Sequence, residues 1–236
     1  MQCVILAGGL AQRLRPLTER IPKALVPVAG RPFADHQLSW LASQGVTDVM
    51  FAIGHLGGAI RAFVGAGERW GIRVRYSDEG DTLRGTAGAL RLAYDRELLE
   101  PAFGVLYGDS YLAAPVAAAW AEFAATKPSV LMTVCRNEGR WDVSNVELSD
   151  GFVVRYEKGA AAAGMHHIDY GFSIVDRDAV MPLIEHGAVA DLAEVYQRLS
   201  IDGHVRGFEV SERFYEIGSP AGLAELEKLL GGASSA

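Results

Sequence analysis

Residues 3–23 read CVILAGGLAQRLRPLTERIPK, and this stretch decides how the fold begins. Residues 3–7 are apolar, as in a buried strand. Gly8 and Gly9 follow, and then a long segment rich in arginine and proline without any hydrophobic period. Connections between core elements usually span about four to six residues, so an ordered loop of this length is typical of a binding element. The stretch therefore predicts a strand followed by a ligand-binding loop.

The rest of the chain predicts an α/β fold. Strand-like runs separated by helically spaced segments lie at residues 3–7, 48–54, 72–77, 103–109 and 129–135. This alternation predicts a doubly wound, mostly parallel, Rossmann-like sheet. From about Asn137 the runs become shorter, as antiparallel strands do. These shorter runs lie at residues 143–148, 152–158 and 167–175. We interpret them as a small antiparallel subdomain inserted before the final strand and helix.

Composition excludes several classes of protein. A net charge of −7 argues against nucleic acid as a partner, because binding a polyphosphate backbone needs a broad basic face. No apolar run approaches the roughly 18 residues that cross a membrane, and no cationic leader follows Met1. We therefore expect a cytoplasmic protein. Cys3 and Cys135 lie in apolar runs and are expected to be reduced, buried thiols.

The opening loop has the composition of a phosphate-binding element. Ligands of a doubly wound sheet bind beyond the carboxyl ends of its strands. Gly8 and Gly9 would let the backbone approach phosphate oxygens, and Arg13 and Lys23 could neutralise their charge. Neither G-x-G-x-x-G nor G-x-x-x-x-G-K-[ST] occurs, which disfavours a dehydrogenase or a P-loop protein. A simple glycine turn is the alternative, but it does not explain the long basic loop.

Residues 6–23 resemble the signature of the sugar-1-phosphate nucleotidyltransferases, in which a strand precedes G-G-x-x-x-R-[LM]-x-P-L-T and then P-K. The matching residues are Gly8, Gly9, Arg13, Leu14, Pro16, Leu17, Thr18, Pro22 and Lys23. Ala11 and Gln12 depart from it, because the family most often has glycine and threonine there.

This resemblance implies roles for the loop. Arg13 would hold the triphosphate and the developing charge, and Lys23 would contact the phosphates of nucleotide and sugar. These two are the expected catalytic residues. Leu6, Gly8 and Gly9 would bind the nucleotide.

Two carboxylates are candidates for a magnesium site, since Mg²⁺ is usually bound by one or two carboxylates with phosphate oxygens and water. Asp109 follows an apolar strand and a glycine, and resembles the family's metal-binding aspartate. Glu216 stands in FYEIGSP, where the family has D-[IT]-G-[TS]-P. The alternatives are an ordinary turn at Asp109 and, at Glu216, a carboxylate that interacts with the next helix N-terminus.

The segment LRGTAGAL resembles the family's L-G-T-A-G-[AP]-L, which lies against the base and ribose. Gly85, Thr86 and Gly88 match it and would bind the nucleotide. In the family the base is selected just upstream, near Glu79, Asp81 or Thr82 here, and the sequence leaves the base open. A helix N-terminus capped by Thr86 is compatible with this interpretation.

The acceptor side is expected in the antiparallel part. VRYEKG resembles the family's E-K-P, so Glu157 would contact sugar hydroxyls and Lys158 the sugar phosphate. HIDYGFSIV resembles a stretch that usually reads N-A-G, with Asp169 in place of the asparagine and Gly171 retained. Asn145 is a further candidate for this pocket. We interpret Trp141, His166 and His167 as surface and strand residues rather than as metal ligands.

These assignments define the expected parts of the chain. We predict a single nucleotidyltransferase domain over residues 1–230, with Ser219 and Pro220 starting its last helix. The nucleotide-binding part, the sugar-side part, the final strand with its helices and a frayed tail would span about 1–135, 136–185, 186–230 and 231–236.

The resemblance implies a Mg²⁺-dependent joining of a nucleoside triphosphate to a sugar 1-phosphate. LYGDSYL, NVE and HIDYGFSI look most like heptose-1-phosphate guanylyltransferases and muramate-phosphate uridylyltransferases. Two alternatives remain: a cytidylyltransferase acting on phosphocholine or a phosphonate, and a non-catalytic nucleotide-sugar sensor. A sensor would have little need of Arg13, Lys23 and Asp109 together. We expect one catalytic domain without the left-handed β-helix that some relatives carry, and neither nucleic acid nor a membrane as partner. The oligomeric state stays open.

Overall fold

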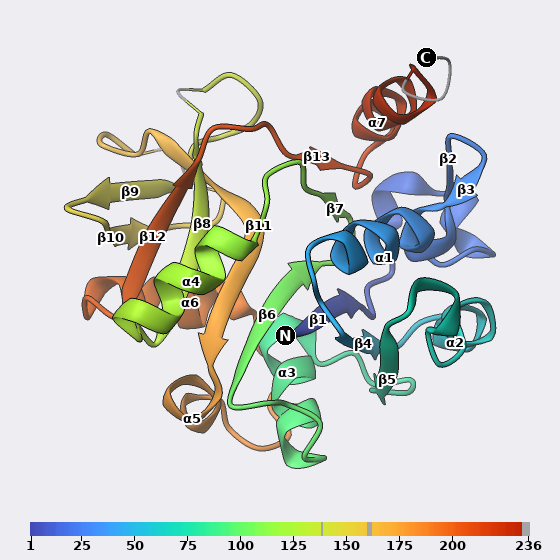
Figure 1. Ribbon diagram of the computed structural model, residues 1–236, viewed down its shortest axis with the longest axis horizontal. Coiled ribbons are helices and arrows are strands. Elements are labelled where there is room, and N and C mark those ends of the chain that lie inside the picture. Colours follow the sequence, from blue (N-terminus) through green and yellow to red (C-terminus); the bar gives the residue numbers. More distant parts are fainter. Residues whose placement is uncertain (138, 160–161, 233–236) are drawn as a thin grey trace.

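The computed structural model describes residues 1–137, 139–159 and 162–232. Over these residues the chain forms a nine-stranded sheet with the order β5-β4-β1-β6-β11-β8-β12-β10-β9 (Figure 1). Its strands are β1 (Gln2–Ala7), β4 (Asp48–Ile53), β5 (Arg73–Asp78), β6 (Ala102–Tyr107), β8 (Val130–Arg136), β9 (Val146–Ser149), β10 (Phe152–Tyr156), β11 (His167–Asp176) and β12 (Val205–Val210).

The predicted α/β class is confirmed. Strands β5, β4, β1 and β6 run parallel, and β12 runs parallel to β8. Strand β11 is antiparallel to both β6 and β8 and joins the two parallel groups. The antiparallel strands therefore belong to the same sheet as the nucleotide-binding part rather than to a second one. The reason is that β11 is ten residues long and buried on both faces, so it fits the centre of a sheet.

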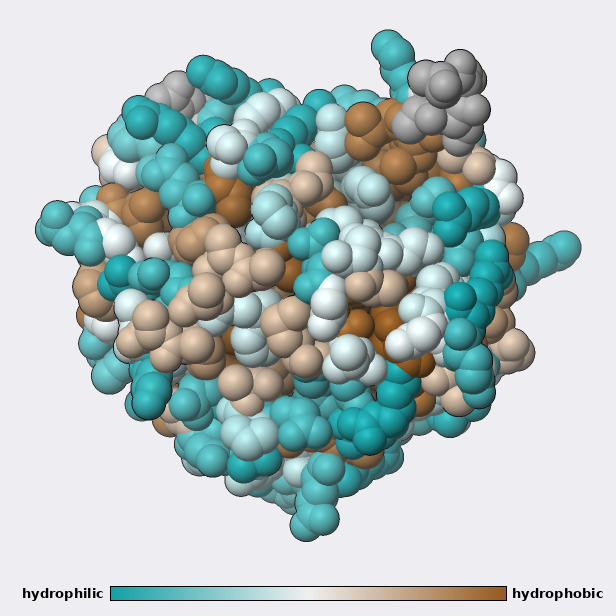
Figure 2. Space-filling view, in the orientation of Figure 1, coloured by the Kyte–Doolittle hydropathy of each residue, from teal (hydrophilic) through white to brown (hydrophobic). Residues whose placement is uncertain are grey.

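Helices cover both faces of the sheet. The helices are α1 (Phe33–Ser43), α2 (Gly57–Val64), α3 (Gly85–Asp95), α4 (Ala117–Thr126), α5 (Arg177–Val180), α6 (Leu192–Ile201) and α7 (Pro220–Gly232). One hydrophobic core takes its helical residues from α1, α2 and α4, and the opposite core takes them from α3, α5 and α6. These faces are the near and far sides in Figure 1. In the space-filling view, the pale brown band over α4 reflects the alanines on its outer side (Figure 2).

The last helix starts where the sequence predicts. α7 begins at Pro220, and the N–H of Gly222 donates to Ser219 Oγ at 3.1 Å. Leu226 of α7 packs with Phe33 in a third, smaller cluster. The helix continues to Gly232, so residues 231–232 are helical rather than frayed, and residues 233–236 lie outside the described part of the chain.

Short elements shape the loops. The opening loop forms three 3₁₀ turns, and the remaining short elements are two strand pairs and two further 3₁₀ turns. They are η1 (Gln12–Leu14), η2 (Leu17–Glu19), η3 (Lys23–Leu25), η4 (Glu68–Trp70), η5 (Met181–Leu183), β2 (Pro27–Val28), β3 (Arg31–Pro32), β7 (Ser110–Tyr111) and β13 (Tyr215–Glu216). Strand β7 pairs with β13, which brings the segment after β6 against the segment before α7.

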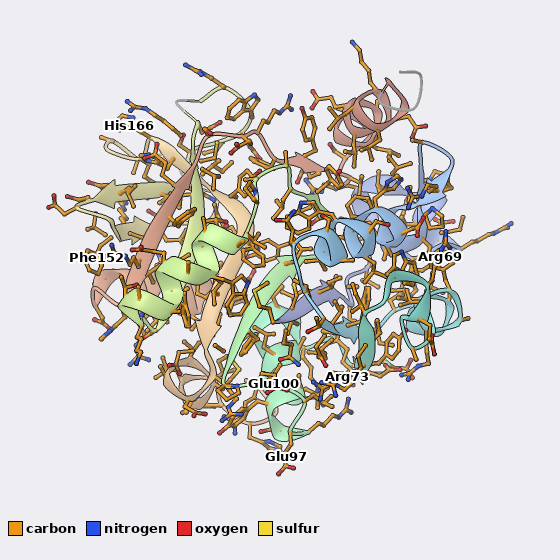
Figure 3. The ribbon with its side chains drawn as sticks, in the orientation of Figure 1. Arg69, Arg73, Glu97, Glu100, Phe152 and His166 are labelled. Atoms are coloured by element: carbon orange, nitrogen blue, oxygen red, sulfur yellow. The ribbon has the colours of Figure 1, made fainter. Side chains whose placement is uncertain are left out.

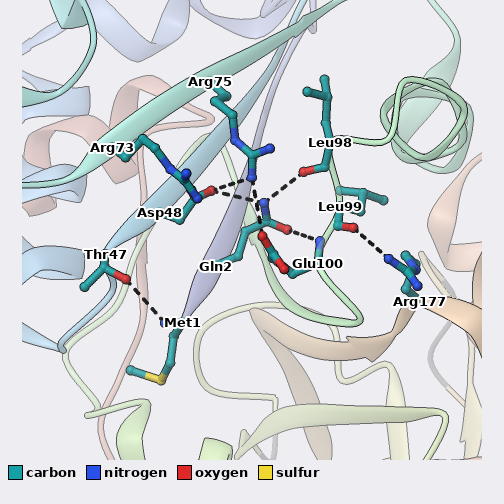
Figure 4. Close-up of polar contacts among 10 residues, drawn as sticks. All are labelled: Met1, Gln2, Thr47, Asp48, Arg73, Arg75, Leu98, Leu99, Glu100 and Arg177. Carbon is teal, nitrogen blue, oxygen red and sulfur yellow. Dashed lines mark hydrogen bonds and ion pairs between the residues drawn. The ribbon is translucent and has the colours of Figure 1, made fainter.

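The edge where the parallel strands begin carries a buried polar network. In Figure 3 the exposed Arg73, Glu97 and Glu100 mark the outside of this edge. Figure 4 shows Gln2, whose Nε2 donates to Asp48 Oδ1 at 3.1 Å and to the Leu98 carbonyl at 2.9 Å. Its Oε1 accepts from the Glu100 N–H at 2.8 Å. The amide of Gln2 thus ties β1 to β4 and to the loop before β6.

Two sequence expectations concern the surroundings of the protein. Cys3 and Cys135 are buried, as predicted. Across residues 1–137, 139–159 and 162–232, none of the helices is long and apolar enough to cross a lipid bilayer.

Candidate active site

A cavity of about 500 Å³ opens at the carboxyl ends of β1, β4 and β6. The chain goes from β1 to one side of the sheet through β4 and β5, and returns on the other side of β1 with β6. Such a change of direction separates the loops that follow neighbouring strands and leaves a ligand-binding crevice. The predicted site residues that line this cavity are Leu6, Gly8, Gly9, Arg13, Lys23, Gly85, Thr86, Asp109, Asn145, Lys158, Asp169, Gly171 and Glu216. The lining does not include Gly88 or Glu157.

Ala11 and Thr18 shape the opening loop. Ala11 has φ 48° and ψ 42°, in the left-handed region that favours glycine. The buried Thr18 donates from Oγ1 to the Ala11 carbonyl at 2.8 Å, and the Leu14 N–H donates to the same oxygen at 3.1 Å. These bonds explain why the loop keeps this conformation although alanine replaces the usual glycine. They place Arg13 in the cavity lining.

Asp109 and Glu216 come together through the pairing of β7 with β13. Glu216 lies opposite Ser110 in this pair, and the Ile217 N–H donates to the Asp109 carbonyl at 2.9 Å. Both side chains converge on Gly218. A Cβ on Gly218 would lie 3.1 Å from Asp109 Oδ2 and 3.3 Å from Glu216 Oε2.

Two cationic side chains join the carboxylates. Arg13 Nη2 lies 2.6 Å from the position of a Cβ on Gly218, and Lys23 Nζ donates to Asp109 Oδ2 at 2.9 Å. Burial, followed by the charge of Asp109, raises the pKa of the Glu216 carboxyl, while Arg13 lowers it. An added cation would relieve this repulsion between the carboxylates.

The donor set fits Mg²⁺. Mg²⁺ prefers oxygen ligands and usually takes one or two carboxylates, completing its octahedron with phosphate oxygens and water. Asp109 and Glu216 supply these carboxylates, and Gly218 adds no side chain of its own at the point where they converge with the Arg13 guanidinium. Over the part of the chain that the structure describes, no group of three or more His, Cys, Asp and Glu side chains is placed to bind a metal. Water, and the phosphates of a substrate where these are bound, would complete the coordination of the ion.

Glu79 lies at the β4 and β5 side of the cavity. A Cβ on Gly8 would overlap Glu79 Oε1, and a Cβ on Gly54 would lie 2.8 Å from the same atom. The Arg84 N–H donates to Glu79 Oε2 at 2.7 Å, and burial raises the pKa of the Glu79 carboxyl. Asp81 and Thr82 are exposed and outside the lining. Of the three candidates upstream of α3, Glu79 is therefore the one that reaches the cavity.

Thr86 does not cap its own helix. α3 begins at Gly85, and Thr86 Oγ1 donates to Asp191 Oδ1 at 2.8 Å and accepts from the Leu192 N–H at 2.7 Å. The hydroxyl therefore connects the start of α3 to the start of α6. Two backbone N–H groups at the start of α3, which could otherwise donate to a nucleotide, already have partners in the protein. The N–H groups of Ala87 and Gly88 donate to the Ala190 carbonyl at 3.0 and 3.3 Å.

Gly88 has a packing role in the structure. A Cβ at this position would overlap the Ala188 carbonyl, so glycine lets the segment before α6 lie directly against α3. This close approach turns Gly88 away from the cavity, which is why the predicted nucleotide contact is not part of the lining. The nucleotide side instead presents Gly85, Leu83 and Ala89.

The acceptor side of the cavity is organised around Asp169. Its carboxylate accepts from the Gly171 N–H at 2.9 Å and from the Tyr156 hydroxyl at 3.2 Å, and its own N–H donates to Asn145 Oδ1 at 2.9 Å. Burial raises the pKa of Asp169 to about 6. Asp169, Asn145 and Gly171, which the sequence suggests for one pocket, therefore lie together.

Lys158 and Glu157 differ in their surroundings. Lys158 donates to Asp191 Oδ2 at 2.7 Å, whereas Glu157 Oε2 accepts from Arg155 at 2.7 Å outside the cavity. Neighbouring residues of an extended chain point to opposite sides. Because Tyr156 faces the cavity, Glu157 faces away from it and Lys158 returns to it.

Sequence reasoning missed an aromatic wall and one acidic residue. The missed lining residues are Tyr107, Tyr156, Tyr170, Phe214 and Asp142. Aromatic residues in strand-like runs ordinarily indicate a core, so no local signal distinguished them.

The histidines behave as predicted. His167 contacts Glu209 from a strand position, with 3.5 Å between Nε2 and Oε1, and His166 is exposed at the outer end of the sheet (Figure 3). Trp141 lies under the Arg213 guanidinium, 5.8 Å from it.

The fold and this cavity define a doubly wound α/β protein with two cationic and two carboxylate side chains gathered at the topological switch point of its sheet. Comparison with known proteins makes the class specific. The nucleotidyl transferase family model matches residues 2–141, and the chain belongs to this family.

The relatives agree with this assignment. Mannose-1-phosphate guanyltransferase beta-A of Xenopus laevis is 30% identical over 93% of this chain and 62% of its own length. Glucose-1-phosphate thymidylyltransferase of Streptomyces griseus is 33% identical over 64% of this chain and 42% of its own. The chain thus spans about two fifths to three fifths of the length of these relatives. A Bacillus anthracis crystal structure, described as a glucose-1-phosphate thymidylyltransferase with sucrose, shares the fold, with a TM-score of 0.86, 21% identity and coverage of 98% and 96% of the two chains.

Proposed function

We propose that the protein is a sugar-1-phosphate nucleotidyltransferase, which joins a nucleoside triphosphate to a sugar 1-phosphate. The observation that supports this most is the convergence of Arg13, Asp109 and Glu216 over Gly218, with Lys23 paired to Asp109. This charged centre lies in one cavity between the Glu79 side and the Asp169 side. Such an arrangement suits two phosphorylated substrates that meet at their phosphates.

The reaction needs a nucleophile but no general base. A phosphate monoester has its second pKa near 6 and is largely ionised at neutral pH. An oxygen of the acceptor phosphate attacks the α-phosphorus, and the bond from this phosphorus to the β-phosphate oxygen breaks, so that pyrophosphate leaves. The cavity lining contains no histidine or cysteine within the described chain, in agreement with a reaction driven by positioning and charge.

The cationic residues would reduce the repulsion between the two anions. Arg13 offers a planar fork of donors suited to phosphate oxygens. Lys23 is paired with Asp109 at 2.9 Å and would move its ammonium toward the substrate phosphates once they are present. Both side chains would bind more strongly to the transition state, in which negative charge accumulates on the oxygens around the α-phosphorus.

Asp109 and Glu216 would hold Mg²⁺. When bound there, this ion stabilises charge on the reacting phosphate oxygens. Gly218 adds no side chain at this position. Burial and the charge of Asp109 raise the pKa of the Glu216 carboxyl, and a divalent cation between the two carboxylates would favour its ionised form.

The acceptor would bind against Asp169, Asn145 and Gly171, with its phosphate near Lys158. The named relatives act on mannose 1-phosphate and glucose 1-phosphate, and the resemblance in the sequence favours a heptose 1-phosphate with guanosine triphosphate. Glu157 contributes only if Arg155 releases it.

Pyrophosphate release across a grid of nucleoside triphosphates and sugar 1-phosphates, in the presence of Mg²⁺, tests the proposal. One productive pair is expected and would identify base and acceptor together. Turnover of CTP with phosphocholine or a phosphonate would instead indicate the cytidylyltransferase. If no pair releases pyrophosphate while the protein still binds nucleotide-sugars, the result would indicate the non-catalytic sensor.

A further inference from the structure

Gln37 interrupts the apolar inner side of α1. The helix packs on the sheet through Ala34, Leu38 and Leu41, and Gln37 is as buried as they are, with 1% of its surface exposed. A polar residue at a core position conflicts with the local pattern, and such conflicts are expected at functional sites. The structure shows where its polar atoms go.

The carboxamide of Gln37 spans the turn that carries Asp109. Its Nε2 donates to the Tyr107 carbonyl at 3.2 Å and to the Ser110 carbonyl at 2.9 Å. These two residues flank Gly108 and Asp109 in the chain. The amide must present its nitrogen here, because an oxygen in the same place would face two carbonyl oxygens.

The other end of the amide makes no compensating contact. Gln37 Oε1 is buried and has no hydrogen-bond partner among the described residues. An unpaired buried acceptor lowers the stability of the folded protein, and leucine or methionine at position 37 would avoid this cost. The presence of glutamine at position 37 is therefore explained by the two hydrogen bonds that Nε2 donates, and not by a contribution to the stability of α1.

Other bonds fix the remaining sides of this turn. The Gly108 N–H donates to the Leu6 carbonyl at 3.0 Å, and the Ile217 N–H donates to the Asp109 carbonyl at 2.9 Å. Gln37 adds the support from α1, on the core side. With the peptide groups held from these directions, the Asp109 carboxylate is directed toward Lys23 and Gly218.

We propose that Gln37 is a positioning residue, which fixes the Asp109 carboxylate in the geometry that binds the divalent cation. This inference rests on the proposed function for the role of Asp109. Residues that orient metal ligands typically contribute about 10-fold to 100-fold to metal affinity. The effect of Gln37 would pass entirely through the backbone of residues 107–110.

The test is a Gln37→Met variant, which keeps the length of the side chain and removes both donated bonds. The matched control is Gln2→Met. Gln2 is also buried and also donates from Nε2 to a backbone carbonyl, but it lies at the amino ends of the parallel strands, away from the cavity (Figure 4). Binding of Mn²⁺ to the otherwise ligand-free full chain is measured by electron paramagnetic resonance, together with the melting temperature.

We expect both variants to melt at lower temperature and only Gln37→Met to bind Mn²⁺ more weakly, by about 10-fold. Should Gln37→Met fail to fold, Gln37→Asn serves in its place, because its shorter amide cannot reach both carbonyls. Mn²⁺ affinity equal to that of the wild type in a folded Gln37 variant overturns the inference, and so does a wild type that binds no Mn²⁺. Selective loss of Mn²⁺ binding in a protein that releases no pyrophosphate with any substrate pair would support the role of Gln37 and refute the proposed function.

Discussion

Replacing Gly218 with alanine should weaken metal binding and raise the stability of the folded protein. The added Cβ would lie 2.6 Å from Arg13 Nη2, 3.1 Å from Asp109 Oδ2 and 3.3 Å from Glu216 Oε2. The first distance forces the guanidinium to move, and the other two are tighter than ordinary van der Waals contact. The methyl group would therefore occupy the space between the two carboxylates.

The expected magnitudes follow from these distances. Disturbing the groups around metal ligands costs about 10-fold to 100-fold in affinity or activity, or roughly 1.4–2.7 kcal/mol. Gly218 does not have a positive φ, so its backbone accepts alanine. Alanine also reduces the freedom of the unfolded chain, which stabilises a protein by about 0.4–1 kcal/mol where no strain opposes it. The clash involves the end of the flexible Arg13 side chain, which can move away. Most of the expected gain in stability therefore remains.

The assay combines Mn²⁺ binding, pyrophosphate release and thermal melting. Gly58→Ala in α2 is the control, because a Cβ there meets no atom within 4 Å and lies outside the cavity. We expect the control to keep full Mn²⁺ affinity with an equal or higher melting temperature. If Gly218→Ala binds Mn²⁺ and turns over as well as Gly58→Ala, the convergence of side chains over Gly218 is not the metal site and the reasoning is refuted.

Three further predictions concern the carboxylates. Asp109→Asn should lower Mg²⁺-dependent pyrophosphate release by at least about 100-fold while circular dichroism shows an intact fold; undiminished turnover would remove Asp109 from the metal site. Glu216→Asp should keep or raise kcat/KM if the carboxylate binds metal, and a collapse of kcat/KM in the folded variant would indicate that the longer side chain is required. Because burial raises the pKa of Asp169 from 3.8 to about 6, the folded state binds a proton more tightly than the unfolded state, and this contribution to stability is lost as pH rises from about 4 to 6. Asp169→Asn should therefore remove that part of the pH dependence of the melting temperature and raise the melting temperature at pH 7.5 relative to the wild type, and an unchanged profile would contradict the burial of a charged Asp169.

The fold was predictable from local patterns. Apolar runs and helical spacing are recorded in consecutive residues, so the α/β class and the start of α7 at Pro220 could be inferred. The place of β11 could not, because its apolar run suits an edge subdomain as well as a central strand. That place depends on pairing with β6 and β8, which are distant in the chain.

The candidate site was predictable to the extent that its residues carry a local motif. The loop from Gly8 to Lys23, Asp109 and Asp169 stand in short segments with distinctive residues, and the structure brings them to one cavity. Glu157 and Gly88 match their motifs equally well and do not line it. The motif records the residue type, whereas the alternation of an extended chain and the approach of the segment before α6 decide the direction of the side chain.

The sequence by itself therefore determined the fold class, the position of the loop from Gly8 to Lys23 and the two carboxylates, because each depends on residues close together in the chain. Only the tertiary structure decided that Arg13, Asp109 and Glu216 converge over Gly218, that Asp191 joins Thr86 to Lys158 and that Gln37 supports the turn of Asp109. These contacts join residues that lie far apart in the chain. They exist because the order of strands in the sheet makes their carrying elements neighbours, and no local pattern encodes that order.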